Sequence, residues 1–287
     1  MTYGWGVVAV LIGGLSGSTV GLFVRMIESA DGWQVLFYRS ISFAALVFVF
    51  MLARDGRQAF KRFSGIGVRG AAVALCLGGA FIAYIFSVLL TTVASAVFIL
   101  SASPFIAAVL SMIFLGERPS TLAWICMAAG LAGVGIMMAD GLIGGTILGS
   151  AVALFAAVGY AASIVAYRAG KDIDMMPATC LAGVVAAVVS AFLVKEFAVS
   201  GNDLMFSILL GTVQIGLQYI LITIAARYVP AAEITLLMLT EVIAAPVWVW
   251  LAFGEAPALL TLAGGVVVLA AVAVQAVSAL RSQEHPQ

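Results

Sequence analysis

The chain contains long apolar runs that are almost free of charge and are separated by short turns. With about 20 residues needed for each membrane-spanning helix, ten such runs can be found. They cover residues 5–26, 33–53, 69–90, 93–115, 122–139, 146–167, 176–195, 204–226, 231–253 and 259–280. Because lipid cannot satisfy free backbone polar groups, continuous runs of this length predict helices. We therefore expect an all-α polytopic membrane protein with ten transmembrane helices.

The composition agrees with this expectation. Of the 287 residues, 64% are hydrophobic and only 9% are charged, whereas a soluble domain carries about 25% charged residues. The three cysteines, Cys76, Cys126 and Cys180, all lie in apolar runs and form no disulfide framework or metal-ligand spacing. We expect no cofactor, no metal and no nucleic-acid partner.

One stretch of the chain occurs twice, and each copy is an apolar run that ends in Gly-Glu-x-Pro. The first copy ends at Gly116-Glu117-Arg118-Pro119 and the second at Gly254-Glu255-Ala256-Pro257. The offset between the two glutamates is 255 − 117 = 138 residues, close to half of the chain. The repeat predicts two units of five helices, residues 1–140 and residues 141–287.

A weaker match supports the same division. Ser16–Val24 aligns with Tyr160–Arg168 at an offset of 144 residues, and the longer basic loop Arg54–Arg69 of the first half absorbs the difference from 138. Since five is an odd number of spans, the second unit must cross the bilayer in the opposite sense. Inverted repeats of this kind are typical of secondary transporters, whose substrate site lies near the bilayer midplane.

The basic residues test this topology. If the N-terminus is cytoplasmic, only Arg25 and Lys195 lie in outside loops. The inside loops and tail then hold Arg54, Arg57, Lys61, Arg62, Arg69, Arg118, Arg168, Lys171, Arg227 and Arg281. The positive-inside rule therefore predicts that both termini are cytoplasmic.

Two units of five helices, each with a small-residue fourth helix that runs into Gly-Glu, resemble the drug/metabolite transporter superfamily with two EamA domains. Trp33–Arg39 is similar to the Arg-bearing second helix of that family. Residues 18–22 and 239–242 look most like the YddG-type amino-acid exporters. The resemblance implies export of amino acids or similar metabolites across the bacterial inner membrane, through a central cavity that opens alternately to each side. Pro104 aligns with Val242, but the ninth helix has Pro246, so we expect the second bend to be displaced by about a turn.

Ionisable side chains inside apolar runs are costly and are candidates for function. Glu241 lies near the middle of the ninth run and Arg39 lies in the second. For an amino-acid substrate, the carboxylate could hold the ammonium or carry a proton, and the guanidinium could bind the carboxylate. A structural role is the alternative for both: Arg39 could snorkel or hold backbone carbonyls, and Glu241 could be a protonated hydrogen-bond donor.

Uncharged polar residues at helical spacing complete the predicted substrate site. They are Ser16, Thr19, Tyr84, Ser103, Tyr160, Ser163, Gln214, Gln218 and Trp248. The same stripes could instead form hydrogen bonds between helices.

The leading hypothesis is a monomeric alternating-access exporter whose partners are a small-molecule substrate and membrane lipid. One alternative is a transporter of the same superfamily for a drug cation, a sugar or a nucleotide-sugar; a nucleotide-sugar would need cationic residues for its phosphates, and only Arg39 is available. The other alternative is a membrane-embedded enzyme that acts on lipid-linked substrates. Such enzymes usually carry clustered acids or a His-x-x-x-His motif. Neither is present in the sequence, so we expect no enzyme activity.

Overall fold

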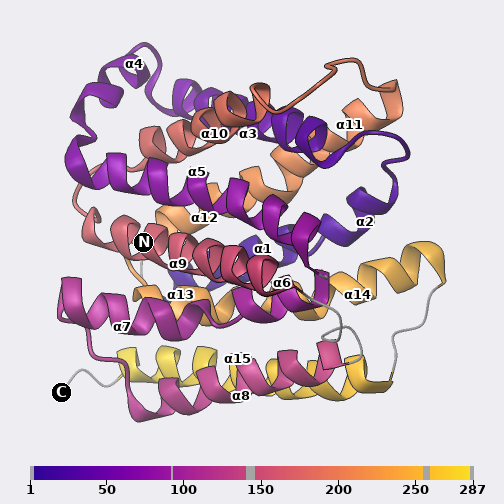
Figure 1. Cartoon of the computed structure of the whole chain (residues 1–287). Helices are drawn as coiled ribbons and strands as arrows, with labels where there is room; N and C mark the ends of the chain where they lie inside the picture. Colours follow the sequence, from indigo (N-terminus) through magenta and orange to yellow (C-terminus); the bar gives the residue numbers. More distant parts are fainter. Residues whose placement is uncertain (1–2, 92, 140–145, 255–258, 285–287) are drawn as a thin grey trace.

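The computed structural model of the chain describes residues 3–91, 93–139, 146–254 and 259–284, and all regular structure in these ranges is helical (Figure 1). The first half contains α1 (Tyr3–Gly17), α2 (Val20–Arg25), α3 (Gly32–Asp55), α4 (Gln58–Arg62), the 3-10 turn η1 (Phe63–Gly65), α5 (Gly67–Leu90), α6 (Val93–Leu100), α7 (Ser103–Leu115) and α8 (Thr121–Met138). The second half contains α9 (Ile147–Ala169), α10 (Met176–Ala191), α11 (Gly201–Leu209), the π-helical segment η3 (Leu210–Gln214), α12 (Ile215–Ala225), α13 (Ala231–Leu237), α14 (Thr240–Phe253) and α15 (Leu259–Glu284).

Within the described residues, eight helical segments are long and apolar enough to cross a membrane. They are Tyr3–Arg25, Gly32–Asp55, Gly67–Ser87, Ser95–Leu115, Ile147–Ala169, Gly201–Ala225, Ala231–Phe253 and Leu259–Ser278. The expected fifth and seventh spans coincide with α8 and α10, which are apolar but shorter. The 16 residues of α10 rise by only about 24 Å, against about 30 Å of hydrocarbon. The chain is a multi-pass membrane protein, and length supports eight of the ten expected spans.

The fourth and ninth apolar runs are each broken into two helices. α6 ends at Leu100 and α7 begins at Ser103, while α13 ends at Leu237 and α14 begins at Thr240. The two breaks are therefore 240 − 103 = 137 residues apart, within one residue of the offset of the repeat. The expectation that the second bend is displaced by about a turn is wrong.

Proline does not decide where these runs break. Pro104 lies at the start of α7. Pro246 lies inside α14, and the helix continues there although proline has no N–H group to donate. At both breaks the backbone turns tighter: the N–H groups of Ala102 and Leu239 bond carbonyls three residues back, at 3.1 Å and 3.0 Å. Such bonds keep the backbone satisfied while the helix axis changes direction.

The first apolar run is also interrupted, although the sequence predicts one continuous helix. α1 ends at Gly17 and α2 begins at Val20. Between them, the Ser18 hydroxyl donates to the Leu15 carbonyl at 2.6 Å and the Thr19 hydroxyl donates to the Ser16 carbonyl at 2.7 Å. Hydroxyl groups that bond the preceding turn compete with the helical ladder.

The eighth run contains the π-helical segment η3 between α11 and α12. A side chain at Gly211 in this segment would overlap the carbonyl of Arg39 and the hydroxyl of Ser42 on α3. The missing side chain therefore allows η3 to lie directly against α3.

The repeated Gly-Glu pairs have a local explanation in helix termination. Gly116 ends α7 with φ 68° and Gly254 ends α14 with φ 70°. In this left-handed conformation a side chain is strained, so glycine is favoured at both positions. Of the second copy, residues 255–257 lie outside the described residues, as does the expected boundary between the units at 140/141.

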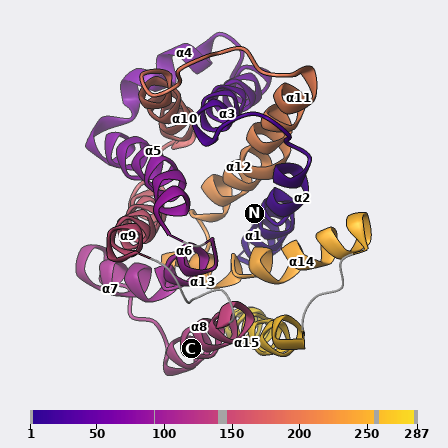
Figure 2. The ribbon, with the colours of Figure 1, turned by 45° about the vertical axis from the view of Figure 1, so that its right-hand side comes forward.

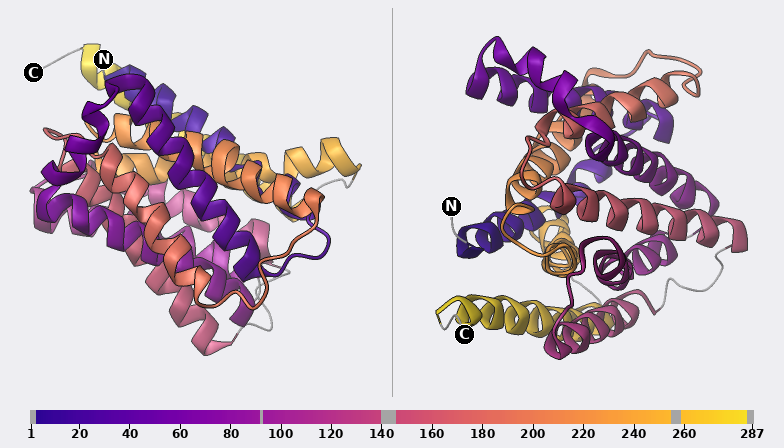
Figure 3. Two further views of the ribbon diagram at one scale, coloured as in Figure 1. Left: turned by 90° about the horizontal axis from the view of Figure 1, so that it is seen from above. Right: turned by 90° about the vertical axis from the view of Figure 1, so that its left-hand side faces the viewer.

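Helices from the two halves pack against each other throughout the bundle. α5 packs on α9, α1 on α12, α3 on α10, and α7 on α13, while α8 and α15 lie side by side at the edge (Figures 1 and 2). The start of α1 and the end of α15 lie at the same end of the bundle (Figure 3).

One buried acid holds two connections together at the end of the bundle away from the start of α1. The Asp203 carboxylate, in the first turn of α11, accepts hydrogen bonds from the backbone N–H groups of Glu28, Ser29 and Ala30 at 2.8–3.1 Å. It also accepts the Ser29 hydroxyl at 2.6 Å. This side chain therefore fixes the connection between α2 and α3 to the second half of the chain.

The substitution Gly211→Ala tests the close approach of η3 to α3. We expect the free energy of unfolding to fall by about 1–3 kcal/mol, the usual cost of overpacking, because the obstructing Arg39 atom belongs to the backbone. Thermal unfolding in detergent micelles measures the effect. The matched control is Gly79→Ala in α5, where an added Cβ has no heavy atom within 4 Å. Equal melting temperatures of the two variants would contradict the packing.

Candidate functional site

Three segments of the chain meet at Glu241. This residue is the second of α14 and lies just beyond the break in the ninth run. From α12, the buried Gln218 donates its Nε2–H to Glu241 Oε2 at 2.6 Å. α1 passes this pair at its last residue, Gly17, where an added Cβ would overlap both Gln218 Nε2 and Glu241 Oε2.

Gln214 lies one turn before Gln218, at the end of η3. Its Nε2 donates to the Gly17 carbonyl at 3.3 Å. Its Oε1 is buried and accepts no hydrogen bond from the described part of the chain. Buried polar atoms are normally satisfied, so this oxygen is an acceptor available to a bound group.

Trp248 connects α14 to the break in the first run. It lies seven residues, or about two helical turns, after Glu241 on the same face of α14. Its indole Nε1–H donates to the Ser18 hydroxyl at 2.7 Å. The face of α14 that carries Glu241 is thus held against the interruption between α1 and α2.

Arg39 lies on α3, is half-buried, and makes no ion pair with any described residue. Its Nε atom is buried and has no hydrogen-bond partner there. Its Cζ atom lies 5.5 Å from the centroid of the Phe81 ring, a cation–π distance. The guanidinium lies within electrostatic range of Tyr84, Tyr219 and Glu241.

Tyrosines from three further helices surround this pair of charges. Tyr84 of α5 and Tyr160 of α9 are half-buried, and both lie within electrostatic range of Glu241. Tyr219 of α12 is buried and packs edge-on against Phe43 and Phe81, with ring centroids 5.9 Å and 5.4 Å away. Three tyrosines from different helices thus lie within electrostatic range of Glu241.

Three of the serine and threonine residues of the predicted site, Ser16, Thr19 and Ser163, bond to the backbone. Thr19 and Ser163 donate to carbonyls three residues back on their own segments, both at 2.7 Å. Ser16 donates to the carbonyl of Val213 in η3, and Ser103 is buried as the first residue of α7. These contacts give the four residues packing roles, and their contact with substrate stays a prediction.

A second polar layer joins the two halves at the end of the bundle that holds the start of α1. Arg168 at the end of α9 donates its Nε–H to Glu117 Oε1 at 2.7 Å and its Nη1–H to the Arg227 carbonyl at 3.0 Å. The Tyr3 hydroxyl donates to the carboxylate of Glu233 at the start of α13. Both side-chain pairs cross from one half of the chain to the other.

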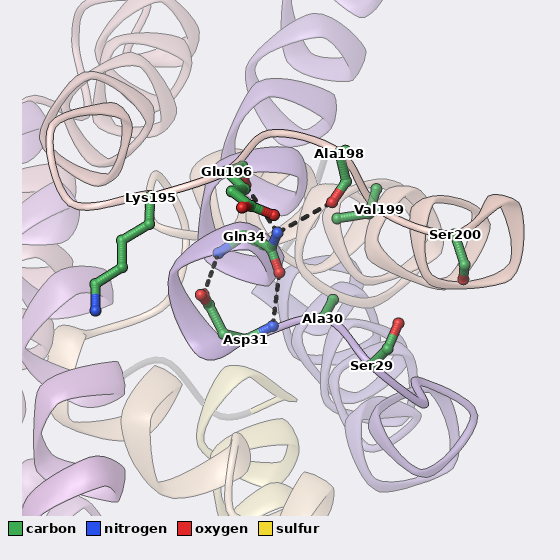
Figure 4. A pocket seen from close by; sticks show the side chains of 9 residues that line it. All are labelled: Ser29, Ala30, Asp31, Gln34, Lys195, Glu196, Ala198, Val199 and Ser200. Atoms are coloured by element: carbon green, nitrogen blue, oxygen red, sulfur yellow. Dashed lines mark hydrogen bonds between the residues drawn. The ribbon is translucent and has the colours of Figure 1, made fainter.

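A cavity of about 520 Å³ opens at the opposite end, between the start of α3 and the connection that precedes α11 (Figure 4). Gln34 is one of the residues that line it: the side chain donates to the Glu196 carbonyl and accepts the Asp31 N–H, both at 2.8 Å. The cavity shares no residue with the predicted site, and we assign it to packing of the two connections. In the described ranges, no group of three or more His, Cys, Asp or Glu side chains could hold a metal ion.

Several contributors to this geometry were missed by the sequence reasoning, among them Gly17 and the aromatic ring of Phe81. Gly17 lies directly before the interruption of the first run and among polar residues, which is a signal for close approach of another segment. Phe81 carries no signal in the sequence, because one phenylalanine in an apolar helix is indistinguishable from its neighbours.

Comparison with protein families gives a match over nearly the whole chain. The EamA-like transporter family matches residues 4–139 and residues 147–276. A crystal structure of another protein is similar with a TM-score of 0.79 and 20% sequence identity, over 96% of this chain and 98% of that chain. At this identity the likeness concerns the fold alone. A comparison with curated proteins gave no match.

Proposed function

Because the chain belongs to the EamA-like transporter family, we propose that it is a secondary transporter that exports amino acids or similar small metabolites from the bacterial cytoplasm. The family assigns it to the drug/metabolite transporters, which indicates transport and not catalysis. The observation that carries the substrate class is the arrangement of Arg39 and Glu241. The two side chains are within electrostatic range and form no ion pair.

Opposite charges in one low-dielectric site attract strongly, and each is costly when it is left unpaired in a membrane. A zwitterion that lies between them satisfies both: its carboxylate binds the guanidinium of Arg39 in a bidentate geometry, and its ammonium binds Glu241. Gln218 holds one oxygen of Glu241, and this leaves the other oxygen, Oε1, for the ligand. The half-buried Tyr84 and Tyr160 offer hydroxyl groups and ring faces to the rest of the molecule.

For the topology, we propose ten spans in two inverted repeats, residues 1–140 and 141–287, with both termini in the cytoplasm. We number the spans 1 to 10 along the chain. The contact of α1 with α12 then joins spans 1 and 8, and the contact of α9 with α5 joins spans 6 and 3. If each span is replaced by the equivalent span of the other repeat, 1 by 6 and 8 by 3, the first pair becomes the second. Three other contacts, α3 with α10, α7 with α13 and α8 with α15, join equivalent spans. The contact of α5 with α10 joins spans 3 and 7, and its counterpart, spans 8 and 2, is the contact of α11, η3 and α12 with α3. A two-fold relation between the repeats produces this pattern.

Alternating access has support in the broken ninth span. α13 packs mainly against α7 and α9 and also contacts α1, α15 and α8, whereas α14 packs against α2, α1 and α15. The two parts share α1 and α15, but their main neighbours differ, and we infer from this that α14 can tilt relative to α13. The bonds of Arg168 to Glu117 and of Tyr3 to Glu233 join the halves at the end that we place in the cytoplasm. We infer that this conformation is closed on the cytoplasmic side.

The substitutions Arg39→Gln and Glu241→Gln test the two-point site. Each removes a charge-assisted hydrogen bond, which contributes about 1.5–3 kcal/mol, so we expect KM for the transported amino acid to rise about 10- to 100-fold in each variant. Counterflow of labelled amino acids in proteoliposomes measures this. Glu196→Gln removes an equal charge from an exposed position and serves as the control. Absence of saturable flux of any tested amino acid by folded wild-type protein would remove this substrate class.

The same pair of variants separates the alternatives. A drug cation needs only the carboxylate, so its flux survives Arg39→Gln and is lost in Glu241→Gln. An anionic substrate such as a nucleotide-sugar gives the opposite result. Only a zwitterionic substrate requires both side chains.

Gly17→Ala tests whether the Gln218–Glu241 pair must keep its position. The overlapping atoms are the flexible ends of two side chains, so we expect them to move aside with little loss of stability. The expected result is a fall in counterflow to the level of Gln218→Ala, with a melting temperature close to that of the wild type. Wild-type flux in Gly17→Ala, with Gly79→Ala as the control, would show that transport tolerates displacement of the pair.

A further inference from the structure

The connection between α3 and α5, residues 56–66, forms most of the longer basic loop Arg54–Arg69 by which the first half exceeds the second. Its structure is defined: it contains α4 and η1, and a glycine with positive φ lies at each end, Gly56 (φ 56°) within it and Gly67 (φ 57°) directly after it. Ala59 is fully buried, and the Phe60 ring packs edge-on against Phe48 of α3 with centroids 5.3 Å apart. The loop is therefore docked on the end of the bundle and is not a loose linker.

Two arginines, Arg54 directly before the loop and Arg62 within it, form ion pairs with acids of the protein. Arg54 pairs with Asp55 at 2.6 Å and with Asp174 from the connection between α9 and α10. Arg62 pairs with the same two acids, at 2.9 Å and 3.1 Å. Two cations and two anions thus form a closed network that holds α4 in place.

Two further cations remain on the outer side of this network. Arg57, directly before α4, and Lys61, in its last turn, are exposed and pair with no acid in the described ranges. Between them, Phe60 is 62% exposed, and Val68 at the start of α5 is 87% exposed. Cations next to exposed apolar side chains at a helix end are typical of the interface between water and lipid.

We propose that Arg57, Phe60, Lys61 and Val68 form a binding surface for the headgroup of an anionic phospholipid in the cytoplasmic leaflet. The two cations bind the phosphate, and the two apolar side chains lie in the adjoining glycerol and acyl region. α4 begins only three residues after α3 ends, so the surface cannot leave the level of the headgroups. The proposal rests on the orientation proposed above, because the anionic lipid of that leaflet supplies the opposite charge.

Lipid titration of the purified full-length protein in neutral detergent tests the surface. The readout is the apparent affinity for phosphatidylglycerol and for phosphatidylcholine, from native mass spectrometry or from the shift in melting temperature. We expect the wild type to prefer phosphatidylglycerol and Arg57→Gln/Lys61→Gln to bind it about 30-fold more weakly. That change corresponds to about 2 kcal/mol for two cations near a charged surface.

The control Arg118→Gln/Lys195→Gln removes the same charge from exposed positions outside the surface. Its binding of phosphatidylglycerol should equal that of the wild type. Equal losses in both double variants, or no preference of the wild type for the anionic lipid, would overturn the proposal. The measurement needs neither substrate nor transport, so its failure is distinct from failure of the proposed function.

Phe60→Ala separates a lipid from a free phosphate ion. We expect this variant to bind phosphatidylglycerol more weakly and to leave the response to inorganic phosphate unchanged. If inorganic phosphate alone stabilises the wild type as much as phosphatidylglycerol does, and Phe60→Ala has no effect, the surface binds an anion and not a lipid.

Discussion

The cost of an unsatisfied hydrogen-bonding group in hydrocarbon governs this structure. It explains why the regular structure of the described ranges is helical, and also how its helices break. At Ser18 and Thr19 the hydroxyl groups bond the turn before them, and at Ala102 and Leu239 the backbone tightens to bonds three residues back. Each interruption therefore keeps its polar groups paired. In the described ranges, two of the buried polar atoms without a hydrogen-bond partner belong to the predicted site, the Nε of Arg39 and the Oε1 of Gln214. The others belong to Ser40, Arg62, Thr91, Glu117 and Gln275.

The main residues of the predicted site come from segments of both halves. Arg39 comes from α3 of the first half, while Gln214, Gln218 and Glu241 come from the second. The first half also contributes Gly17, whose missing side chain leaves room for the Gln218–Glu241 bond. A site assembled in this way depends on the relative position of the halves, which is the property that a carrier of a solute across a membrane requires.

The sequence predicts the coarse features because they depend on composition and length. The apolar runs locate the helices, and the expense of charge in lipid identifies Glu241 and Arg39 without any structural information. The partners could not be found in this way. Helical spacing places Gln214 and Gln218 on one face of their run, but it does not show that Gln218 reaches Glu241, 23 residues away. Asp203 binds a segment more than 170 residues distant, which no local pattern reveals. The predicted position of the second bend was wrong because it was inferred from the proline, whereas the break lies where the local hydrogen bonds tighten.

The location of Glu241 has a mechanical consequence. It lies one residue beyond the joint of the ninth run, at the base of an arm that is 14 residues long. That arm extends about 21 Å, so a tilt of about 10° at the joint displaces its far end by nearly 4 Å. In the proposed mechanism, a ligand that shifts the Glu241 carboxylate by less than an ångström would therefore displace the far end of α14 by several ångströms.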